Sequence, residues 1–240
     1  MKIGIISQAR MTSTRLPGKV LKTANDIPLL KYHIDRLAQS NLPIFIATTI
    51  NKTDDPVVEL CKKEGIPYYR GDENHVLSRY YECAKEYDLD VVVRVTSDCP
   101  LIDGKLIESA WQKYQSVFED YDYISNVIER SYPRGVDFEI FSFVYLKEAF
   151  EKAISPSEIE HVTPYIHQNN SGRTNYYHIL QKGGGKQYRI TVDTPEDFEL
   201  IKILIEAHQA HTLSASEIIG LLDKHPELVK INTHIEQKKI

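Results

Sequence analysis

Short runs of β-branched and apolar residues alternate with helix-like segments over the first half of the chain. Strands are predicted at 3–6, 43–48, 67–70 and 90–95, and helices at 28–38, 54–63, 76–86 and 104–117. Asp54 or Asp55 is expected to cap the second helix, with Pro56 in its first turn. Because parallel strands need crossover connections, this order predicts right-handed βαβ units around a largely parallel sheet with helices on both faces.

The regular alternation of strands and helices ends after residue 120. Strands are predicted at 121–125, 136–141, 175–180 and 187–192, and helices at 143–153, 157–167, 195–208 and 214–224. Three glycines, 183–185, separate the last two strands and favour a hairpin loop. This half is expected to form a small mixed α+β extension of the sheet, and the polar last ten residues are expected to fray.

Composition excludes several classes of protein. A chain of 240 residues can bury a sizeable core, and a net charge of −5 without a long basic block argues against a nucleic-acid binder. The three cysteines are widely spaced without a CxxC pair, which is typical of reduced thiols. The first apolar run is too short for a signal peptide, and no run is long enough to span a membrane. We expect a soluble, cytoplasmic protein.

The stretch SQARMTSTRLPGKVL, residues 7–21, carries three cations directly after the first predicted strand. Ligands of open α/β sheets bind at the carboxyl ends of the strands. The stretch is not a P-loop, because GxxxxGK[ST] is absent. Arg10, Arg15 and Lys19 could instead neutralise phosphates, with Gly18 permitting close approach and Ser13 donating a hydroxyl. The alternative is a solvated basic loop.

Two later strands end in an aspartate that is followed by one residue and a proline. These are Asp98, after VVVRVTS, and Asp193, after YRITV. Two carboxylates at one sheet edge, together with phosphate oxygens, can hold Mg²⁺. Each aspartate alone could be only a helix cap or a turn residue. Asp197 is expected in the first turn of the following helix, where the helix dipole favours it.

These motifs also carry a family resemblance. The stretches QAR at 8–10, RLPGK at 15–19, SDCPL at 97–101 and VDTPED at 192–197 resemble the acylneuraminate and ketodeoxyoctonate cytidylyltransferases. Within that family, the chain is most similar to the spore-coat polysaccharide biosynthesis protein F (SpsF) group. The resemblance extends from about residue 3 to about residue 205.

The resemblance implies a GT-A-like nucleotidyltransferase fold in one domain, 1–240, with 126–185 as a candidate sugar-binding or dimerisation lobe. The implied enzyme is a homodimer that transfers CMP from CTP to an acidic sugar for spore-coat or cell-surface polysaccharide biosynthesis, releasing pyrophosphate. Arg10, Lys19 and Asp98 would be catalytic, and Asp98 and Asp193 would hold Mg²⁺. The nucleotide would contact Gln8, Ala9, Arg10, Ser13, Arg15, Gly18, Lys19, Thr48, Arg70, Gly71 and Arg79.

Base recognition is where the chain departs from the family. The family's Ser-Gly-Thr-x-x-Arg-like stretch is replaced by RGDENHVLSR at 70–79, in which Arg79 alone matches. Thr48, Arg70 and Gly71 could line the base, or could be simply a strand end and a turn. A preference for cytosine over uracil therefore rests on the resemblance.

The sugar side is predicted from two stretches. YPRGVDFEIF at 132–141 contains Arg134, Asp137 and Glu139, and EHVTPYI at 160–166 places His161 and Tyr165 four positions apart. Arg134 could pair with the carboxylate of an acidic sugar. Alternatively, Asp137 and Glu139 alternate as on a solvent-facing strand, and the histidine is structural.

Two other functions fit parts of this pattern. The first is a GT-A glycosyltransferase that uses a nucleotide-sugar donor, whose usual Asp-x-Asp could be only DYD at 120–122, which is expected to begin a strand. The second is a non-catalytic nucleotide-binding subunit of a polysaccharide assembly complex. A non-catalytic subunit would not explain why Arg10, Arg15 and Lys19 occur together with Asp98 and Asp193.

Overall fold

The computed structural model describes residues 1–236. The strands are β1 (Ile3–Gln8), β2 (Thr23–Ala24), β3 (Ile27–Pro28), β4 (Ile44–Thr49), β5 (Tyr68–Gly71), β6 (Val91–Thr96), β7 (Tyr123–Ser125), β8 (Glu139–Ser142) and β9 (Tyr176–His178). The α-helices are α1 (Leu29–Ala38), α2 (Asp55–Glu64), α3 (Val76–Glu86), α4 (Gly104–Val117), α5 (Phe143–Lys152), α6 (Pro156–His161), α7 (Pro164–His167), α8 (Pro195–Glu206), α9 (Ala215–Lys224) and α10 (Pro226–Val229). The 3-10 helices are η1 (Lys19–Leu21), η2 (Lys52–Asp54) and η3 (Ala210–Thr212).

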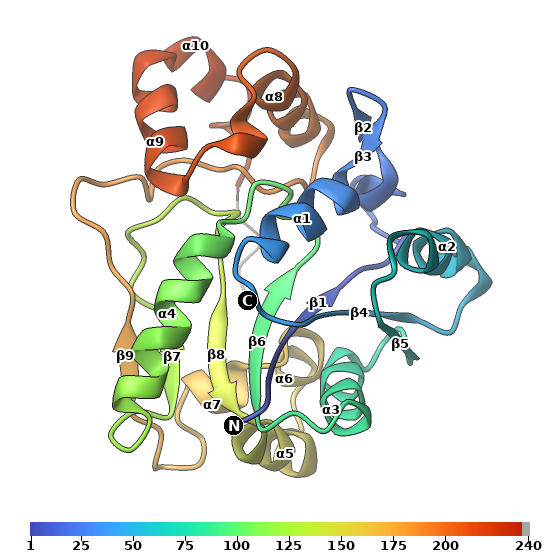
Figure 1. Ribbon diagram of the computed structural model, residues 1–240, viewed down its shortest axis with the longest axis vertical. Coiled ribbons are helices and arrows are strands. Elements are labelled where there is room, and N and C mark those ends of the chain that lie inside the picture. The colour runs from blue at the N-terminus through green and yellow to red at the C-terminus, as the bar shows by residue number, and fades with distance from the viewer. Residues whose placement is uncertain (237–240) are drawn as a thin grey trace.

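Seven of the strands in residues 1–236 form one sheet, in the order β5-β4-β1-β6-β8-β7-β9. β5, β4, β1 and β6 are parallel, as the alternation of strands and helices predicts. β8 is antiparallel to both β6 and β7, and β9 is parallel to β7. The predicted mixed extension is therefore confirmed, and it is β8 that reverses the direction (Figure 1).

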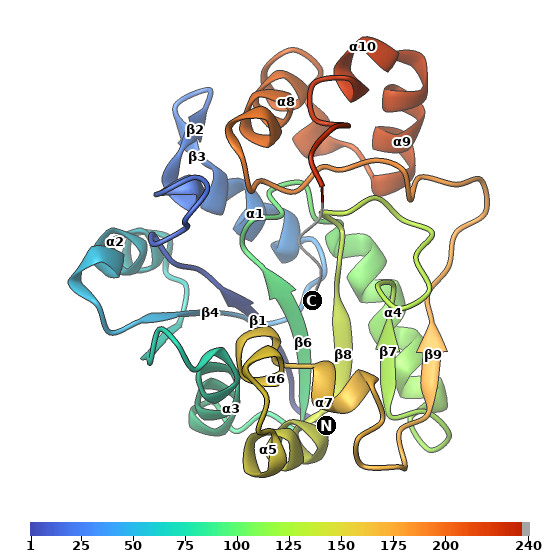
Figure 2. The same cartoon turned by 180° about the vertical axis from the view of Figure 1, so that it is seen from behind.

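Helices cover both faces of the sheet because the central strands are apolar on both sides. Ile5 and Val93 pack with α1, α2 and α4, whereas Ile6 and Val92 pack with α3, α5 and α7. Complete burial of each such side chain stabilises the fold by roughly 1.5–3 kcal/mol. A third cluster joins α8, α9 and α10 beyond one end of the sheet, and Figures 1 and 2 show α5, α6 and α7 at the opposite end.

The predicted strand at 187–192 and the hairpin before it are wrong. This segment makes only an isolated bridge, between Arg134 and Arg189, and β9 pairs with β7 instead. Tyr188, Ile190 and Val192 are buried in the cluster of α8 and α9. Every second side chain of this segment packs against helices, so apolar and polar residues alternate as in a strand although the segment does not pair with the sheet. Glycines 183–185 have φ between 90° and 121°, which suits a loop.

Two further local features differ from the predictions. The predicted helix at 157–167 is divided into α6 and α7 at Val162, whose φ of 72° cannot continue a helix. The β2–β3 hairpin was not predicted, and its turn places Asn25 and Asp26 at positive φ. Of the polar last ten residues, 237–240 lie outside the described residues, but Asn232 does not fray: it is hydrogen-bonded and 3% exposed.

Candidate active site

The loop after β1 is held in a compact form by its own backbone. The Met11 carbonyl accepts hydrogen bonds from the amides of Ser13 (3.0 Å) and Gly18 (2.8 Å), and Gly18 has a φ of 68°. Asp54 does not cap α2 through its side chain; its buried carboxylate accepts the Met11 amide at 2.7 Å. The loop is thus fastened to the end of β4 and leads directly into η1.

Lys19, the first residue of η1, lies between the two predicted aspartates. Its Nζ is 3.0 Å from Asp98 Oδ2 and 2.8 Å from Asp193 Oδ1. Burial opposes the charge on Lys19, but the two carboxylates outweigh it and raise the pKa of Lys19. Burial also opposes the charge on Asp98, which by itself would raise the pKa of that carboxyl. Lys19 and the Thr96 hydroxyl outweigh burial and lower the pKa of Asp98 to about 2. Lys19 and Asp98 are therefore both charged at neutral pH.

The backbone joins the two aspartate segments. Asp98 follows β6, and its carbonyl accepts the Val192 amide at 2.7 Å and the Thr191 hydroxyl at 3.1 Å. The structure thus brings residues 95 positions apart to the same edge of the sheet, since Asp193 comes directly after Val192.

Two arginines hold the second oxygen of Asp193. Arg15 Nη2 lies 3.1 Å from Asp193 Oδ2, and Arg189 Nη2 donates to the same oxygen at 2.8 Å. Arg189 also donates to the fully buried Asp197 through Nε and Nη2, at 2.8 and 2.9 Å. Asp197 is in the first turn of α8, as predicted, and forms a capping box with Thr194. The sequence does not predict its pairing with Arg189, because residues 189–194 are not helical and a spacing of four has no helical meaning there.

Asp98 and Asp193 suit a hard divalent cation. Their side chains supply oxygen donors, and both already converge on one positive charge, the ammonium group of Lys19. Within residues 1–236 no group of three His, Cys, Asp or Glu side chains is placed to hold a metal. The chain would therefore supply two carboxylates, and phosphate or water oxygens would complete the coordination.

Two side chains near the end of β1 have polar atoms without a partner. Gln8 Oε1 and the Nε and Nη1 of Arg79 are buried and make no hydrogen bond within residues 1–236. Gly71 leaves room for Arg79, because a Cβ there would lie 2.8 Å from Arg79 Cγ. Burial and the nearby Arg10 lower the pKa of Arg79. Unpaired buried groups are costly, so a polar ligand that reached them would bind favourably.

Other predicted nucleotide residues have structural partners. Arg10 Nη1 lies 3.8 Å from Glu73 Oε1, and Ala9 is buried after β1. Thr48 is fully buried and donates to Asp54 at 3.2 Å. Arg70 donates to the carbonyls of Thr49 and Asn51 and pairs with Asp55 at 2.8 Å. The polar groups of Thr48 and Arg70 therefore fix the loop after β4, and their contact with the base stays a prediction.

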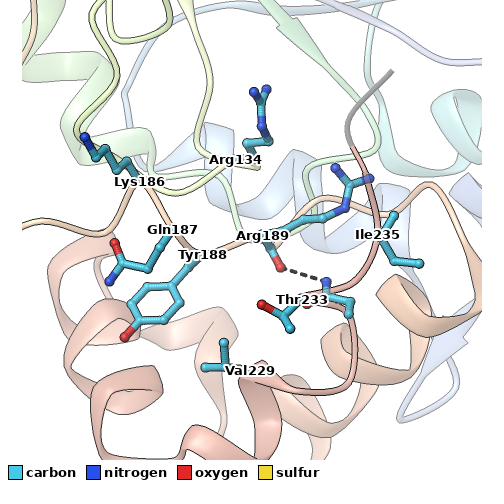
Figure 3. Close-up of a pocket in the computed structure, with 9 residues that line it drawn as sticks. Arg134, Lys186, Gln187, Tyr188, Arg189, Val229, Thr233 and Ile235 are labelled. Carbon is cyan, nitrogen blue, oxygen red and sulfur yellow. Dashed lines mark hydrogen bonds between the residues drawn. The ribbon is translucent and has the colours of Figure 1, made fainter. Parts of the chain in front are cut away.

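On the predicted sugar side, Asp137 is paired with Arg130 through two hydrogen bonds, of 2.6 and 3.1 Å. Burial and the neighbouring Arg130 and Arg189 lower the pKa of Arg134, and the charge of Asp137 opposes this shift only in part. A pocket of about 110 Å³ lies beside this arginine, lined by Arg134, Lys186, Gln187, Tyr188, Arg189, Val229, Asn232, Thr233 and Ile235. Figure 3 shows the charged ends of Arg134, Lys186 and Arg189 on one side of this pocket.

Three other predicted sugar residues have structural roles of their own, and their contact with a sugar stays a prediction. Glu139 is 3% exposed, and its carboxylate binds Arg94, Tyr123 and Thr163. His161 ends α6, and the break at residue 162 prevents it from sharing a helix face with Tyr165. Tyr165 packs in the cluster of α3 and α5. These positions look favourable in the sequence because a register and a helix break cannot be read from spacing.

Two remaining predictions concern the cysteines and the membrane. Cys61, Cys83 and Cys99 are free and buried, and burial raises the pKa of each thiol. This agrees with packed thiols. None of the helices formed by residues 1–236 is long and apolar enough to cross a bilayer.

The sequence matches known proteins over most of its length. The family model described as Cytidylyltransferase matches residues 3–219. The spore coat polysaccharide biosynthesis protein SpsF of Bacillus subtilis is 35% identical, over 92% of this chain and 94% of its own.

Two solved structures share the fold. A cytidylyltransferase from Leptospira borgpetersenii has a TM-score of 0.90 and 32% identity, with all of both chains covered. A CMP:2-keto-3-deoxy-manno-octonic acid synthetase complexed with CTP has a TM-score of 0.65 and 18% identity, covering 87% of this chain and all of its own, which supports the fold alone. By its match to the family model and to close relatives over nearly its whole length, the chain belongs to the cytidylyltransferase family and has its nucleotidyltransferase fold.

Proposed function

We propose that this protein transfers CMP from CTP to a hydroxyl group of an acidic sugar and releases pyrophosphate. The observation that carries the proposal is the position of Lys19, held between Asp98 and Asp193 with Arg15 at 3.1 Å from the same cluster. Such a set of charges suits a free triphosphate. The similarity to SpsF supports a product used for spore-coat or cell-surface polysaccharide. The proposal includes a homodimer that acts in the cytoplasm.

The triphosphate would bind along the loop after β1. Lys19 and Arg15 would exchange their contacts with Asp193 for phosphate oxygens, and Arg10, whose side chain is 39% exposed, would reach the same chain of phosphates. The loop backbone near Gly18 and the Ser13 hydroxyl would border it. Gln8 and Arg79 have the unpaired polar atoms that a pyrimidine edge would satisfy.

Asp98 and Asp193 would hold Mg²⁺, whose chemistry is to neutralise phosphate charge and to polarise the α-phosphate. The acceptor hydroxyl attacks the α-phosphorus and forms a new P–O bond. The bond to the β-phosphate breaks, pyrophosphate leaves, and the hydroxyl proton passes to solvent. Positioning and charge neutralisation by Lys19 and the arginines provide most of the catalysis in such a transfer.

The acceptor would bind beside Arg134, whose backbone bridges that of Arg189, the residue that binds Asp193. The Arg134 guanidinium group could form a charge-assisted pair with the carboxylate of an acidic sugar. The pocket along residues 186–189 gives the acceptor further polar surface.

The arrangement of the sheet disfavours the glycosyltransferase alternative. Asp120 and Asp122 precede β7, which runs in the direction of β6, so they lie at the amino edge of the sheet, whereas Asp98 lies at the carboxyl edge. Asp122 is also used locally, since Oδ2 accepts the Asn175 amide at 2.8 Å. An Asp-x-Asp metal site is therefore not supported.

The decisive experiment compares ligands by thermal shift and then by turnover. CTP, UTP, ATP, GTP, CMP and a UDP-sugar are each tested with and without Mg²⁺; a ligand at about 100 times its Kd adds about 2.7 kcal/mol. We expect the largest shift with CTP and Mg²⁺, and pyrophosphate release when an acidic sugar is added. A larger shift with the UDP-sugar would favour the glycosyltransferase. Binding of CTP without pyrophosphate release from any acidic sugar would favour the non-catalytic subunit.

A further inference from the structure

The segment after α10 returns to the candidate active site. It contains Asn232, which is 3% exposed although its neighbours Thr233 and His234 are exposed. Asn232 Nδ2 donates to the Arg189 carbonyl at 3.0 Å and to Asp197 Oδ1 at 2.8 Å. Figure 3 shows this segment beside Arg189, on the wall of the pocket. The family model ends at residue 219, so Asn232 lies beyond the matched region.

Asn232 is the outer end of a continuous chain of contacts. It binds Asp197, Asp197 accepts Arg189, and Arg189 Nη2 donates to Asp193 Oδ2 at 2.8 Å. The other oxygen of Asp193 accepts Lys19. The side-chain amide of Asn232 is therefore connected to the proposed cation site through two residues that are themselves buried.

The position of the Asp193 carboxylate depends on Arg189, which binds both Asp193 and Asp197. The guanidinium group is planar and serves Asp193 and Asp197 at once, so its orientation depends on where the carboxylate of Asp197 lies. The amides of Asp193 and Thr194 donate to Oδ2 of that carboxylate, and Asn232 donates to Oδ1 and to the carbonyl of Arg189. Loss of both Asn232 contacts would loosen Oδ1 of Asp197 and the backbone of Arg189, and with them the contact of Arg189 with Asp193.

We propose that Asn232 is a positioning residue for the cation site, acting through Asp197 and Arg189 on Asp193. The proposal rests on the function proposed above, in which Asp193 is a ligand of the divalent cation. Outer residues that orient metal ligands typically change metal affinity or activity by about 10–100-fold when they are replaced.

The test uses Asn232→Leu, which keeps the volume of the side chain and removes both donated hydrogen bonds. Mn²⁺ binding to the full chain with CTP is measured by electron paramagnetic resonance, alongside the Mg²⁺ dependence of pyrophosphate release. We expect the Kd for Mn²⁺ and the Mg²⁺ concentration for half-maximal rate to rise about 10-fold. His234→Ala, an exposed change in the same segment, should leave both values unchanged.

Several outcomes separate the two proposals. A wild-type protein that binds no Mn²⁺ with CTP, or releases no pyrophosphate, overturns the proposed function. If the wild type does both, and Asn232→Leu lowers only the Tm while both metal constants stay at the wild-type value, the role of Asn232 is structural and the inference is wrong. Should Asn232→Leu not fold, Asn232→Ser, a smaller change that also shortens the donor, is measured against the same criteria.

Discussion

Lys19 donates a hydrogen bond to Asp98 at 3.0 Å, although the two residues are 79 positions apart. Asp98→Asn keeps the shape of the side chain and removes the charge that both Lys19 and a divalent cation require. We expect the rate of pyrophosphate release to fall by about 10²–10³-fold, as for other lost electrostatic partners in active sites.

The matched control is Asp35→Asn, which removes an exposed carboxylate paired with Lys31 on α1. Circular dichroism should show both variants folded, and Asp35→Asn should keep its activity. An Asp98→Asn enzyme with the wild-type rate would remove Asp98 from the proposed cation site.

Replacement of Lys19 separates binding of the triphosphate from binding of the nucleoside. Lys19→Ala removes one charge-assisted contact, worth about 1.5–3 kcal/mol, from the outer phosphates. Titration calorimetry should therefore show a loss of affinity for CTP of roughly 10-fold or more, with a smaller loss for CMP. Lys62→Ala, on the exposed face of α2, serves as control. Equal losses for the two nucleotides would contradict a contact with the β- or γ-phosphate.

A buried ion pair between β6 and β8 predicts a large effect on stability. Arg94 and Glu139 are paired, with side chains 15% and 4% exposed. Arg94→Leu leaves the Glu139 carboxylate buried without its counter-charge, at a cost of about 3–5 kcal/mol in the free energy of unfolding. Urea denaturation measures this cost.

The double variant Arg94→Leu/Glu139→Gln supplies the control, because it removes the charge that would be left unpaired. It should recover a large part of the lost stability. If the double variant is no more stable than Arg94→Leu, the loss comes from packing and not from the unpaired charge.

His33 predicts a dependence of stability on pH. Its ring is fully buried; Nδ1 donates to the Cys99 carbonyl at 2.8 Å, so in the neutral ring Nε2 accepts from the Ser7 hydroxyl at 2.8 Å. Burial lowers the pKa of His33 to about 4, whereas the unfolded chain titrates near the usual 6.5. Between these values the unfolded state binds the extra proton, so stability falls as the pH is lowered, by up to about 3 kcal/mol.

Urea denaturation at pH 7 and at pH 4.5 gives the measurement. His33→Gln keeps a donor for the Cys99 carbonyl but does not titrate, so its loss of stability between the two pH values should be smaller than that of the wild type. Equal losses would mean that His33 is protonated in the folded state near its ordinary pKa.

The sequence predicts helices and strands, which depend on neighbouring residues. It does not predict side-chain contacts between segments that are distant in the chain. The strand before Asp98 and the helices 76–86 and 104–117 carry their own periodicity, and the structure has both helices at those bounds. Glu139 has no such signal, because its partner Arg94 is known only from the antiparallel register of β6 and β8. Asn232 is a single polar residue near residue 236, and no sequence pattern predicts its contacts. The sequence predicts a strand at Arg189 because the apolar residues on either side of it alternate, and in the structure they pack against helices.

The reversed direction of β8 has a consequence for how such an enzyme can change. Residues that follow β6 and residues that precede β8 arrive at the same edge, since Arg94 pairs with Glu139. The loop after β1 and the stretch 126–138 therefore reach the same edge of the sheet from separate parts of the sequence. In the proposed enzyme, a new acceptor would be accommodated by substitutions in that short stretch, while the loop after β1 keeps its sequence unchanged.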